Sequence, residues 1–329
     1  MTRASVMALG AGAWGTALAN VAAVGRARVP LWGRDPVHVE ELARTRENAR
    51  LLSGLRLADA VTPTADLSEV RAAEIVLCAA PAQAVRSVAR AARPYLATGA
   101  AFVICAKGIE QGTRAFMSEV VSEEAPQVEI AVLSGPSFAA DVCQGLPTAV
   151  TVAARTEALA QQLAEQLSSR SFRLYRSVDV RGVEIGGAAK NVLAIACGMA
   201  AGRRLGASAN AALIARGFAE LRRLGAAWGA KTETLMGLSG LGDLVLTCGS
   251  NQSRNFALGE ALGRGEALKD ASHGKLAEGA FTASALTEIA RSRSVEMPIC
   301  QSVTEILAGS LAVESAIDAL LMRPLRAEG

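Results

Sequence analysis

Short apolar runs alternate with longer, partly polar stretches through the first half of the chain. Each run is flanked by glycine, proline or charged residues and lacks the period of an amphipathic helix. Such runs are typical of strands buried on both faces of a parallel sheet. This alternation predicts a doubly wound, mostly parallel α/β sheet. The expected strands are residues 6–9, 28–32, 74–79, 101–106, 129–133, 148–153 and 172–175, and the expected helices between them are 36–46, 83–92, 114–122 and 156–167.

The pattern changes at about residue 180. Beyond it, apolar residues follow helical spacing between glycines, and no run of strand character stands out. We therefore expect a sheet-containing first domain, residues 1–179, and an all-helical second domain, residues 180–329. No low-complexity linker separates them, so the two domains are expected to pack directly on each other. The expected helices of the second domain include 186–201, 209–228, 231–236, 283–291 and 302–308.

A glycine pattern joins the first expected strand to the helix that follows it. Val6–Leu9 runs directly into Gly10-Ala11-Gly12-Ala13-Trp14-Gly15, which has the spacing of a dinucleotide-binding turn. In such a turn Gly10 permits the tight bend, Gly12 lets a pyrophosphate approach the backbone, and Gly15 lets the helix pack closely on the strand. Free N–H groups at the helix N-terminus then face the phosphates. The pattern predicts a Rossmann-like nucleotide-binding domain.

Composition narrows the classes of function. Hydrophobic residues make up 51% of the 329 residues, yet no run approaches the roughly 18 apolar residues of a membrane span, so we expect none. Arg3 and the apolar residues after it resemble a secretory signal, but the three glycines interrupt the continuous apolar core that a signal has. Aromatic residues are 4%, and the net charge is +3 without a polybasic block. Nucleic-acid partners therefore gain little support.

The cysteines and histidines indicate the redox state of the compartment and whether a metal site is expected. The six cysteines are widely spaced, without a C-x-x-C pair, and we expect buried thiols in a reducing cytoplasm. Neither His38 nor His273 has a second plausible ligand nearby in the sequence. We therefore expect no metal site.

Candidate chemistry follows the ends of two expected strands, because ligands of doubly wound sheets bind beyond the carboxyl ends of the strands. Lys107 comes directly after 101–106, and Gly135-Pro136-Ser137 comes directly after 129–133. The ammonium group, the backbone N–H groups and the hydroxyl there could contact a ligand. A solvated lysine and an ordinary turn are the competing interpretations.

Lys190 lies in a stretch of small and apolar residues, Gly186–Ile195, with no acid at helical spacing. Its amine must either extend to water or be buried with a lowered pKa, and the second state suits proton transfer near neutral pH. Asp243 follows a glycine-rich segment, and Thr247 falls four residues later on the same helical face. Asp243 could equally be a helix cap.

Consecutive polar residues at Asn251–Asn255 form a candidate phosphate site. The planar guanidinium of Arg254 matches phosphate oxygens, and Ser253 and Asn255 add neutral donors. A solvated loop is the competing interpretation.

Taken together, these motifs resemble the NAD(P)-dependent glycerol-3-phosphate dehydrogenases of the bacterial type. The matching stretches, in the family's order, are GAGAWGTALA, LWGRD, AKGIE, LSGPSFA, GLPTAV, GAAKNVLAI, GLSGLGDLVLTC, NQSRN and AEG. The resemblance implies reversible hydride transfer between NAD(P)H and dihydroxyacetone phosphate, giving sn-glycerol 3-phosphate for phospholipid synthesis. It also suggests a homodimer.

The resemblance implies a role for each matching residue. Lys190 would be the general acid/base, supported by Asn191 and Thr247. Lys107 and Asp243 are also expected to be catalytic, because Lys107 would lower the pKa of Lys190 by repulsion and Asp243 would oppose this and hold the amine in place. Lys107 would contact both substrate and cofactor. The implied substrate residues are Lys107, Gly135, Ser137, Lys190, Asp243, Ser253, Arg254 and Asn255. Besides the glycines of the turn, the implied cofactor residues are Ala13, Trp14, Arg34, Lys107, Ala139, Arg254, Leu276 and Glu278.

The choice of cofactor depends on the end of the second expected strand. Arg34 stands where an acid would bind the ribose 2′-hydroxyl of NAD, and it could instead pair with the 2′-phosphate of NADP. Asp35 lies one residue on and could serve NAD. We therefore expect both cofactors, with a slight preference for NADPH/NADP over NADH/NAD. After Glu278 the chain reads Gly279–Thr282, where family members often carry a bulkier polar or basic stretch.

Two other functions compete with this interpretation. A 3-hydroxyacid dehydrogenase also uses a lysine near an asparagine, but it needs a carboxylate clamp instead of the cluster Asn251–Asn255. A non-catalytic dinucleotide sensor would have no use for a buried proton donor such as Lys190 beside Lys107 and Asp243.

Overall fold

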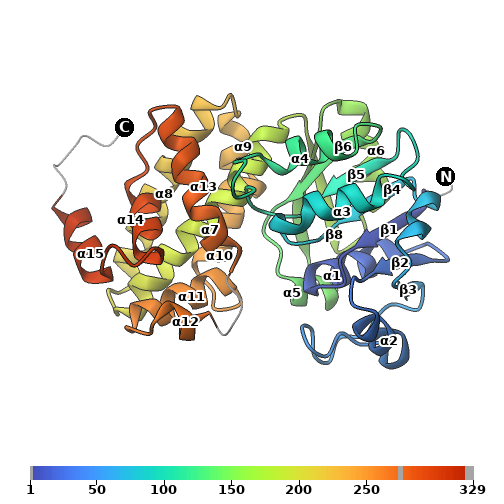
Figure 1. The fold of residues 1–329 in the computed structure, drawn as a ribbon, viewed down its shortest axis with the longest axis horizontal. Helices are drawn as coiled ribbons and strands as arrows, with labels where there is room; N and C mark the ends of the chain where they lie inside the picture. Colours follow the sequence, from blue (N-terminus) through green and yellow to red (C-terminus); the bar gives the residue numbers. More distant parts are fainter. Residues whose placement is uncertain (1–2, 273–276, 323–329) are drawn as a thin grey trace.

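A computed structural model describes residues 3–272 and 277–322, and it has a sheet-containing half beside a helical half (Figure 1). The sheet has eight strands in the order β3-β2-β1-β4-β5-β6-β7-β8. The pairing is parallel except between β6 and β7. The doubly wound, mostly parallel sheet is therefore confirmed. The strands are β1 (Val6–Leu9), β2 (Val29–Trp32), β3 (Val61–Thr64), β4 (Ile75–Cys78), β5 (Ala101–Ile104), β6 (Glu129–Ser134), β7 (Thr148–Ala154) and β8 (Phe172–Ser177).

Strand β3 is missing from the expected elements. Its sequence, Val-Thr-Pro-Thr, lacks a continuous apolar run, and Pro63 cannot donate to a sheet ladder. The structure resolves the conflict by placing β3 at the edge of the sheet, where it pairs with β2 alone. A proline is tolerated at that position because one side of an edge strand needs no ladder partner.

Both faces of the sheet are covered by helices, as the apolar runs predict. Alternate residues of β1 enter different cores: Val6 and Ala8 join one, and Met7 and Leu9 join the other. The first core includes residues of α1 (Ala13–Ala23) and α6 (Glu157–Leu167). The second includes residues of α3 (Val85–Ala92) and α4 (Met117–Glu124). The remaining α-helices of this half are α2 (Pro36–Thr45) and α5 (Ala139–Cys143), and two short 3₁₀ helices cover Leu67–Ala72 and Ala82–Ala84.

The bounds of α4 differ from the expected helix 114–122. Arg114 has a φ of 63°, outside helical geometry. Ile109 and Phe116 form an isolated antiparallel bridge. The helix therefore begins only at Met117.

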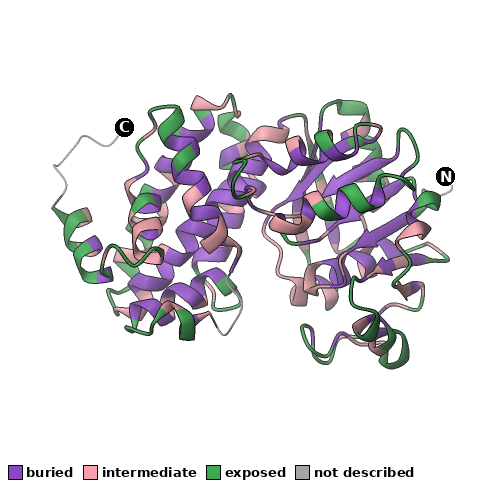
Figure 2. Cartoon of the chain, in the orientation of Figure 1, coloured by how far each residue is buried: buried purple, intermediate pink, exposed green. Residues whose placement is uncertain are grey.

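Described residues after Ser177 form helices and no strand, which confirms the all-helical character expected there. Figure 2 shows the central helix, α7, largely buried. The helices are α7 (Val180–Gly202), α8 (Ala207–Ala227), α9 (Thr232–Met236), a π-helical turn (Leu238–Gly242), α10 (Asp243–Cys248), α11 (Arg254–Gly263), α12 (Leu268–Ala271), α13 (Glu278–Ser292), α14 (Pro298–Leu307) and α15 (Val313–Leu321).

Helix α7 begins earlier than expected, because its glycines serve packing and do not break the helix. Asp179 caps it by accepting a hydrogen bond from the Gly182 N–H. A Cβ atom on Gly198 would lie 2.1 Å from the Phe256 carbonyl oxygen of α11. Helix α7 is long and apolar enough to cross a membrane, but 83% of its most apolar window is buried inside the protein. It is packed as a core helix.

Candidate active site

The two halves of the protein meet where the strands end, and Lys190 of α7 lies buried there. Its Nζ donates hydrogen bonds to Asp243 Oδ1 at 2.6 Å and to Thr247 Oγ1 at 2.9 Å. The Thr247 hydroxyl in turn donates to the Asp243 carbonyl oxygen at 2.6 Å. Asp243 and Thr247 lie one turn apart on α10, so both reach the same amine.

Lys107 approaches the same carboxylate from the sheet. It follows β5, and its Nζ donates to Asp243 Oδ2 at 2.8 Å and to the Gly135 carbonyl oxygen at 3.0 Å. The Ser137 hydroxyl donates to that carbonyl as well, at 3.0 Å. Gly135 has a φ of +150°, and a Cβ there would lie 2.8 Å from Val150 Cα, so the turn requires glycine. One buried carboxylate thus binds two ammonium groups.

The electrostatics of this cluster favour proton transfer by Lys190. Burial lowers the pKa of Lys190 to about 8; attraction to Asp243 opposes this shift, and repulsion from Lys107 adds to it. Burial alone would raise the pKa of Asp243, but the attraction of the two lysines outweighs it and holds that pKa below its usual value. The carboxylate is therefore ionised, and each of its oxygens accepts a hydrogen bond from one of the two lysines. It does not cap a helix, since the N-cap of α10 is Gly242.

A chain of amide groups holds the Lys107 segment against the helices. Asn191 Nδ2 donates to the Lys107 carbonyl oxygen at 3.0 Å, and Asn255 Nδ2 donates to Asn191 Oδ1 at 2.9 Å. The Gly279 N–H completes the chain by donating to Asn255 Oδ1 at 2.8 Å. Both ends of the Asn255 amide are therefore engaged by protein, and its position fits a supporting role.

The expected phosphate residues begin α11. Ser253 is buried and caps the helix by accepting from the Phe256 N–H at 3.3 Å. Arg254 is exposed, and its guanidinium forms no hydrogen bond or ion pair with any residue in the described ranges. It lies close enough to Glu278 to lower the pKa of that carboxyl, although burial has the larger effect and raises it.

The glycine turn has the geometry that its pattern predicts. Gly10 has a φ of +112°, and a Cβ on Gly15 would lie 1.8 Å from the Gly10 carbonyl oxygen. A Cβ on Gly12 would meet nothing within 4 Å, so open space adjoins the backbone there. Ala13 and Trp14 form the first turn of α1, and the indole Nε1 is buried without a partner among the described residues. These features fit a pyrophosphate cradle.

Arg34 and Asp35 follow β2 and differ in what they contact. Asp35 caps α2, with Oδ1 accepting from the Val37 N–H at 3.1 Å. The Arg34 side chain is exposed and forms no hydrogen bond or ion pair within the described part of the chain. The arginine is therefore free to meet a ligand, while the aspartate already has a structural role.

The remaining expected cofactor residues lie on three separate segments. Ala139 is the first residue of α5, which packs against α1. Glu278 begins α13, and its Oε1 accepts from the Ala82 N–H at 3.2 Å, linking the helical half to the loop after β4. Leu276 lies outside the described residues.

Ser134, which is not among the expected site residues, ends β6 beside this site. Its hydroxyl is buried without a hydrogen-bond partner in the described structure, and it lies 2.9 Å from where a Cβ of Gly187 would be. Its position at a strand end is the sequence feature that would predict a place near the ligand.

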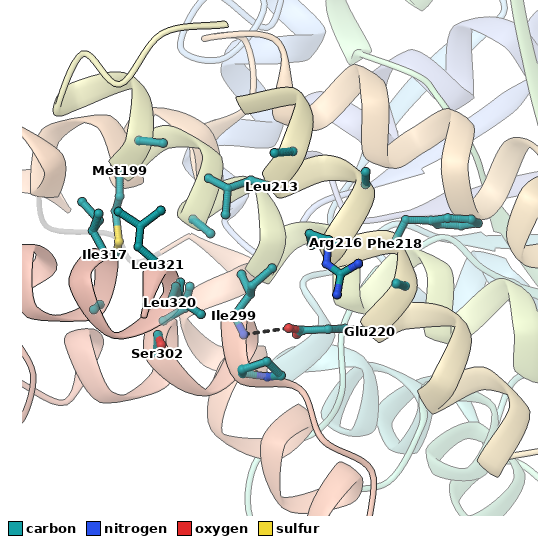
Figure 3. Close-up of a pocket in the computed structure, with 18 of the residues that line it drawn as sticks. Met199, Leu213, Arg216, Phe218, Glu220, Ile299, Ser302, Ile317, Leu320 and Leu321 are labelled. Atoms are coloured by element: carbon teal, nitrogen blue, oxygen red, sulfur yellow. Dashed lines mark hydrogen bonds between the residues drawn. The ribbon is translucent and has the colours of Figure 1, made fainter. Parts of the chain in front are cut away.

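A cavity of about 1010 Å³ lies away from the lysines, between α7, α8, α14 and α15 (Figure 3). Apolar residues such as Met199, Leu213 and Leu320 line it. At one wall Glu220 caps α14, accepting from the Ile299 N–H at 2.8 Å, and burial raises the pKa of Glu220 to about 7. None of the expected site residues lines this cavity.

Two further expectations concern cysteines and metals. All six cysteines are unpaired, and five are buried, with Cys143 half-buried. Burial raises the pKa of Cys78 to about 12, so it is a packing residue and not a nucleophile. No group of three or more potential metal ligands occurs among the described residues.

Comparison with known proteins gives consistent matches along nearly the whole chain. Residues 5–160 match the N-terminal model of NAD-dependent glycerol-3-phosphate dehydrogenase, and residues 179–318 match its C-terminal model. An NAD(P)+ glycerol-3-phosphate dehydrogenase of Azorhizobium caulinodans is 62% identical over 97% of both chains. One from Rhodopseudomonas palustris is 56% identical over 98% of both.

Solved structures agree. The crystal structure of glycerol-3-phosphate dehydrogenase from Coxiella burnetii superposes with a TM-score of 0.93 at 38% identity, covering 98% of this chain and 100% of that one. These matches, together with the lysine cluster and the glycine turn, show that the chain belongs to the NAD-dependent glycerol-3-phosphate dehydrogenase family.

Proposed function

We propose that this protein catalyses the reversible NAD(P)H-dependent reduction of dihydroxyacetone phosphate to sn-glycerol 3-phosphate. The observation that carries the proposal is the buried Lys190–Asp243–Lys107 cluster at the strand edge that also holds the glycine turn. The names of the relatives support the same reaction. The product would feed glycerophospholipid synthesis.

Lys190 would supply the proton. When bound, a reduced nicotinamide would supply hydride to the carbonyl carbon, and negative charge would then develop on the ketone oxygen. The Lys190 ammonium stabilises that charge and transfers a proton to the oxygen, so the neutral amine and the alcohol result. With a pKa of about 8, Lys190 can also accept the proton in the oxidation direction. Asp243 and Thr247 hold Nζ in place, and Asn191 acts indirectly by holding the Lys107 carbonyl.

Arg254 is the proposed phosphate ligand, because its guanidinium is exposed and unengaged by described residues at the start of α11. Binding of the remote phosphate would position the ketone for reaction. Ser253, Gly135 and Ser137 complete the proposed substrate pocket, and Asn255 supports it through the amide chain.

The cofactor would bind across the glycine turn. Gly10, Gly12 and Gly15 shape the turn, and the N-terminus of α1 offers free N–H groups for the pyrophosphate. The names of the relatives support both NAD and NADP. We infer a slight preference for NADP from Arg34, which is free to meet a 2′-phosphate. The other proposed cofactor contacts are Ala13, Trp14, Lys107, Ala139, Arg254 and Glu278.

We further propose that the chain divides at residue 179 into a cofactor domain, 1–179, and a substrate domain, 180–329. The last strand ends at Ser177, and α7 begins at Val180. A homodimer and a cytoplasmic location complete the proposal.

A spectrophotometric assay tests the activity. The purified protein is mixed with dihydroxyacetone phosphate and NADPH or NADH, and nicotinamide absorbance is followed, with unphosphorylated dihydroxyacetone as the matched control. The proposal expects oxidation of both cofactors with the phosphorylated ketone and little with the control. Equal rates with the two ketones would overturn the phosphate assignment, and no oxidation of either cofactor would overturn the reaction.

A further inference from the structure

Two side chains from outside the glycine turn bind one of its carbonyl groups. Asn48 Nδ2 donates to the Ala11 carbonyl oxygen at 3.1 Å, and His38 Nε2 lies 3.2 Å from the same oxygen. A carbonyl can only accept, so Nε2 carries the hydrogen in this contact. Asn48 Nδ2 also donates to Thr16 Oγ1 of α1 at 2.9 Å. The Asn48 side chain is fully buried.

These bonds determine the orientation of the peptide between Ala11 and Gly12. No described peptide bond is cis, and in a trans peptide the C=O and the following N–H point in opposite directions. With the Ala11 oxygen turned toward Asn48 and His38, the Gly12 N–H points away from them. That N–H forms no hydrogen bond with the described residues, and the space beside the Gly12 Cα is open.

We propose that Asn48, assisted by His38, is a positioning residue for the cofactor pyrophosphate. Asn48 does not touch the ligand; it holds the Ala11 carbonyl inward so that the Gly12 N–H is presented outward before the cofactor arrives. Preorganised donors bind an anion more tightly than donors that must rotate first. The inference rests on the proposed dinucleotide site and adds residues that the glycine pattern does not contain.

The burial of Asn48 supports a role beyond packing. Its Oδ1 is buried without a hydrogen-bond partner among the described residues, which costs stability. An apolar residue would avoid that cost but could not donate to Ala11. The two donated bonds to Ala11 and Thr16 are what the amide contributes.

The chain offers a matched control in Asn20. The segment after α2 folds back over α1, and Asn20 fastens it by donating to the Arg56 carbonyl oxygen at 3.0 Å and accepting from the Ala58 N–H at 3.0 Å. Asn20 therefore joins the same helix to the same segment as Asn48. These hydrogen bonds do not involve the glycine turn, so Asn20 reports on structural anchoring alone.

The test measures the dissociation constants of NADPH, NADH and ADP-ribose for the parent, Asn48→Asp and Asn20→Asp. Asn48→Asp keeps the side-chain shape but places an oxygen against the Ala11 carbonyl, which repels it. We expect Kd to rise about tenfold or more, by the same factor for all three ligands, because they share the pyrophosphate. Asn20→Asp is expected to lower the Tm without changing Kd. His38→Phe, which removes the other donor, is expected to raise the three Kd values by a smaller common factor.

The outcomes separate the two proposals. A folded Asn48→Asp variant that binds ADP-ribose as the parent does overturns the positioning role. If that variant does not fold, His38→Phe decides: a raised ADP-ribose Kd supports the role, and an unchanged Kd overturns it. Failure of the parent to bind ADP-ribose would overturn the proposed dinucleotide site itself and this inference with it.

Discussion

Lys190 and Asp243 lie 53 residues apart in the chain and meet in a 2.6 Å hydrogen bond between two buried side chains. A charged pair in such a setting is expensive to desolvate unless each charge is well partnered. Here the carboxylate binds a second ammonium, Lys107, on its other oxygen. The cluster therefore carries a net positive charge at the place where the proposed reaction develops negative charge.

The pH dependence of the reaction follows from the pKa of Lys190, about 8. Reduction needs the protonated amine, so kcat/KM for the ketone should fall as pH rises through about 8. Oxidation needs the neutral amine, so kcat/KM for the alcohol should rise over the same pH interval. Initial rates in both directions, measured on either side of pH 8, check this.

Asp243→Asn should move that profile to lower pH. The substitution removes the attraction that raises the pKa of Lys190, while burial and repulsion from Lys107 remain. An unshifted reduction profile in this variant would show that Asp243 does not control the titrating group.

Arg254→Ala should raise KM for dihydroxyacetone phosphate by about 10- to 100-fold, because a charge-assisted contact with phosphate is lost. With NADPH at saturation, which offsets loss of the cofactor contact also proposed for Arg254, activity on unphosphorylated dihydroxyacetone should be unaffected. Arg264→Ala is the control, since Arg264 lies at the other end of α11 and pairs with Glu266. If both ketones suffered equally, the guanidinium would not be the phosphate ligand.

Arg34→Ala should raise the dissociation constant of NADPH by about tenfold or more and leave that of NADH nearly unchanged, since only NADP carries a 2′-phosphate. Arg44→Ala, in the last turn of α2, provides an exposed arginine as control. Titration of each variant with NADPH and NADH measures the effect. An equal loss with the two cofactors would contradict the assignment.

Two glycines of the turn should separate stability from binding. Gly15→Ala places a methyl group 1.8 Å from the Gly10 carbonyl oxygen and should lower the free energy of unfolding by about 2 kcal/mol or more. Gly12→Ala meets no protein atom within 4 Å and should keep that free energy but weaken NADPH binding. Urea unfolding measures the free energy of unfolding of each variant, and titration with NADPH measures its affinity for the cofactor. Wild-type NADPH affinity in Gly12→Ala would place the pyrophosphate elsewhere.

Much of the fold could be predicted because burial on both sheet faces leaves a continuous apolar run in each inner strand. Strand β3 is not predicted, because it lies at the edge of the sheet and an edge strand tolerates Pro63 and polar residues, which interrupt the apolar run. The start of α7 at Val180 is not predicted, because the pair Gly186 and Gly187 resembles a break at which a helix begins. In the structure α7 runs through both glycines, where a Cβ would lie 2.5 Å from the Ser239 carbonyl oxygen or 2.9 Å from the Ser134 hydroxyl. Local sequence cannot distinguish a glycine that ends a helix from one that packs it.

Some residues of the candidate site can be predicted from local sequence, and others cannot. The end of a strand predicts Lys107 as a site residue, and the apolar setting predicts Lys190. The amide chain through Asn191 and Asn255 joins residues 64 positions apart, and the Asn48 contact with Ala11 spans 37. Such contacts depend on how separate elements pack, so no local pattern predicts them.

Turnover of Lys190→Ala with dihydroxyacetone phosphate and NADPH tests the central claim most directly. The account predicts that NADPH still binds with parental affinity while kcat falls by about 10²- to 10⁴-fold, because the proton donor is missing. A kcat near that of the parent would contradict the account and remove Lys190 from the chemistry.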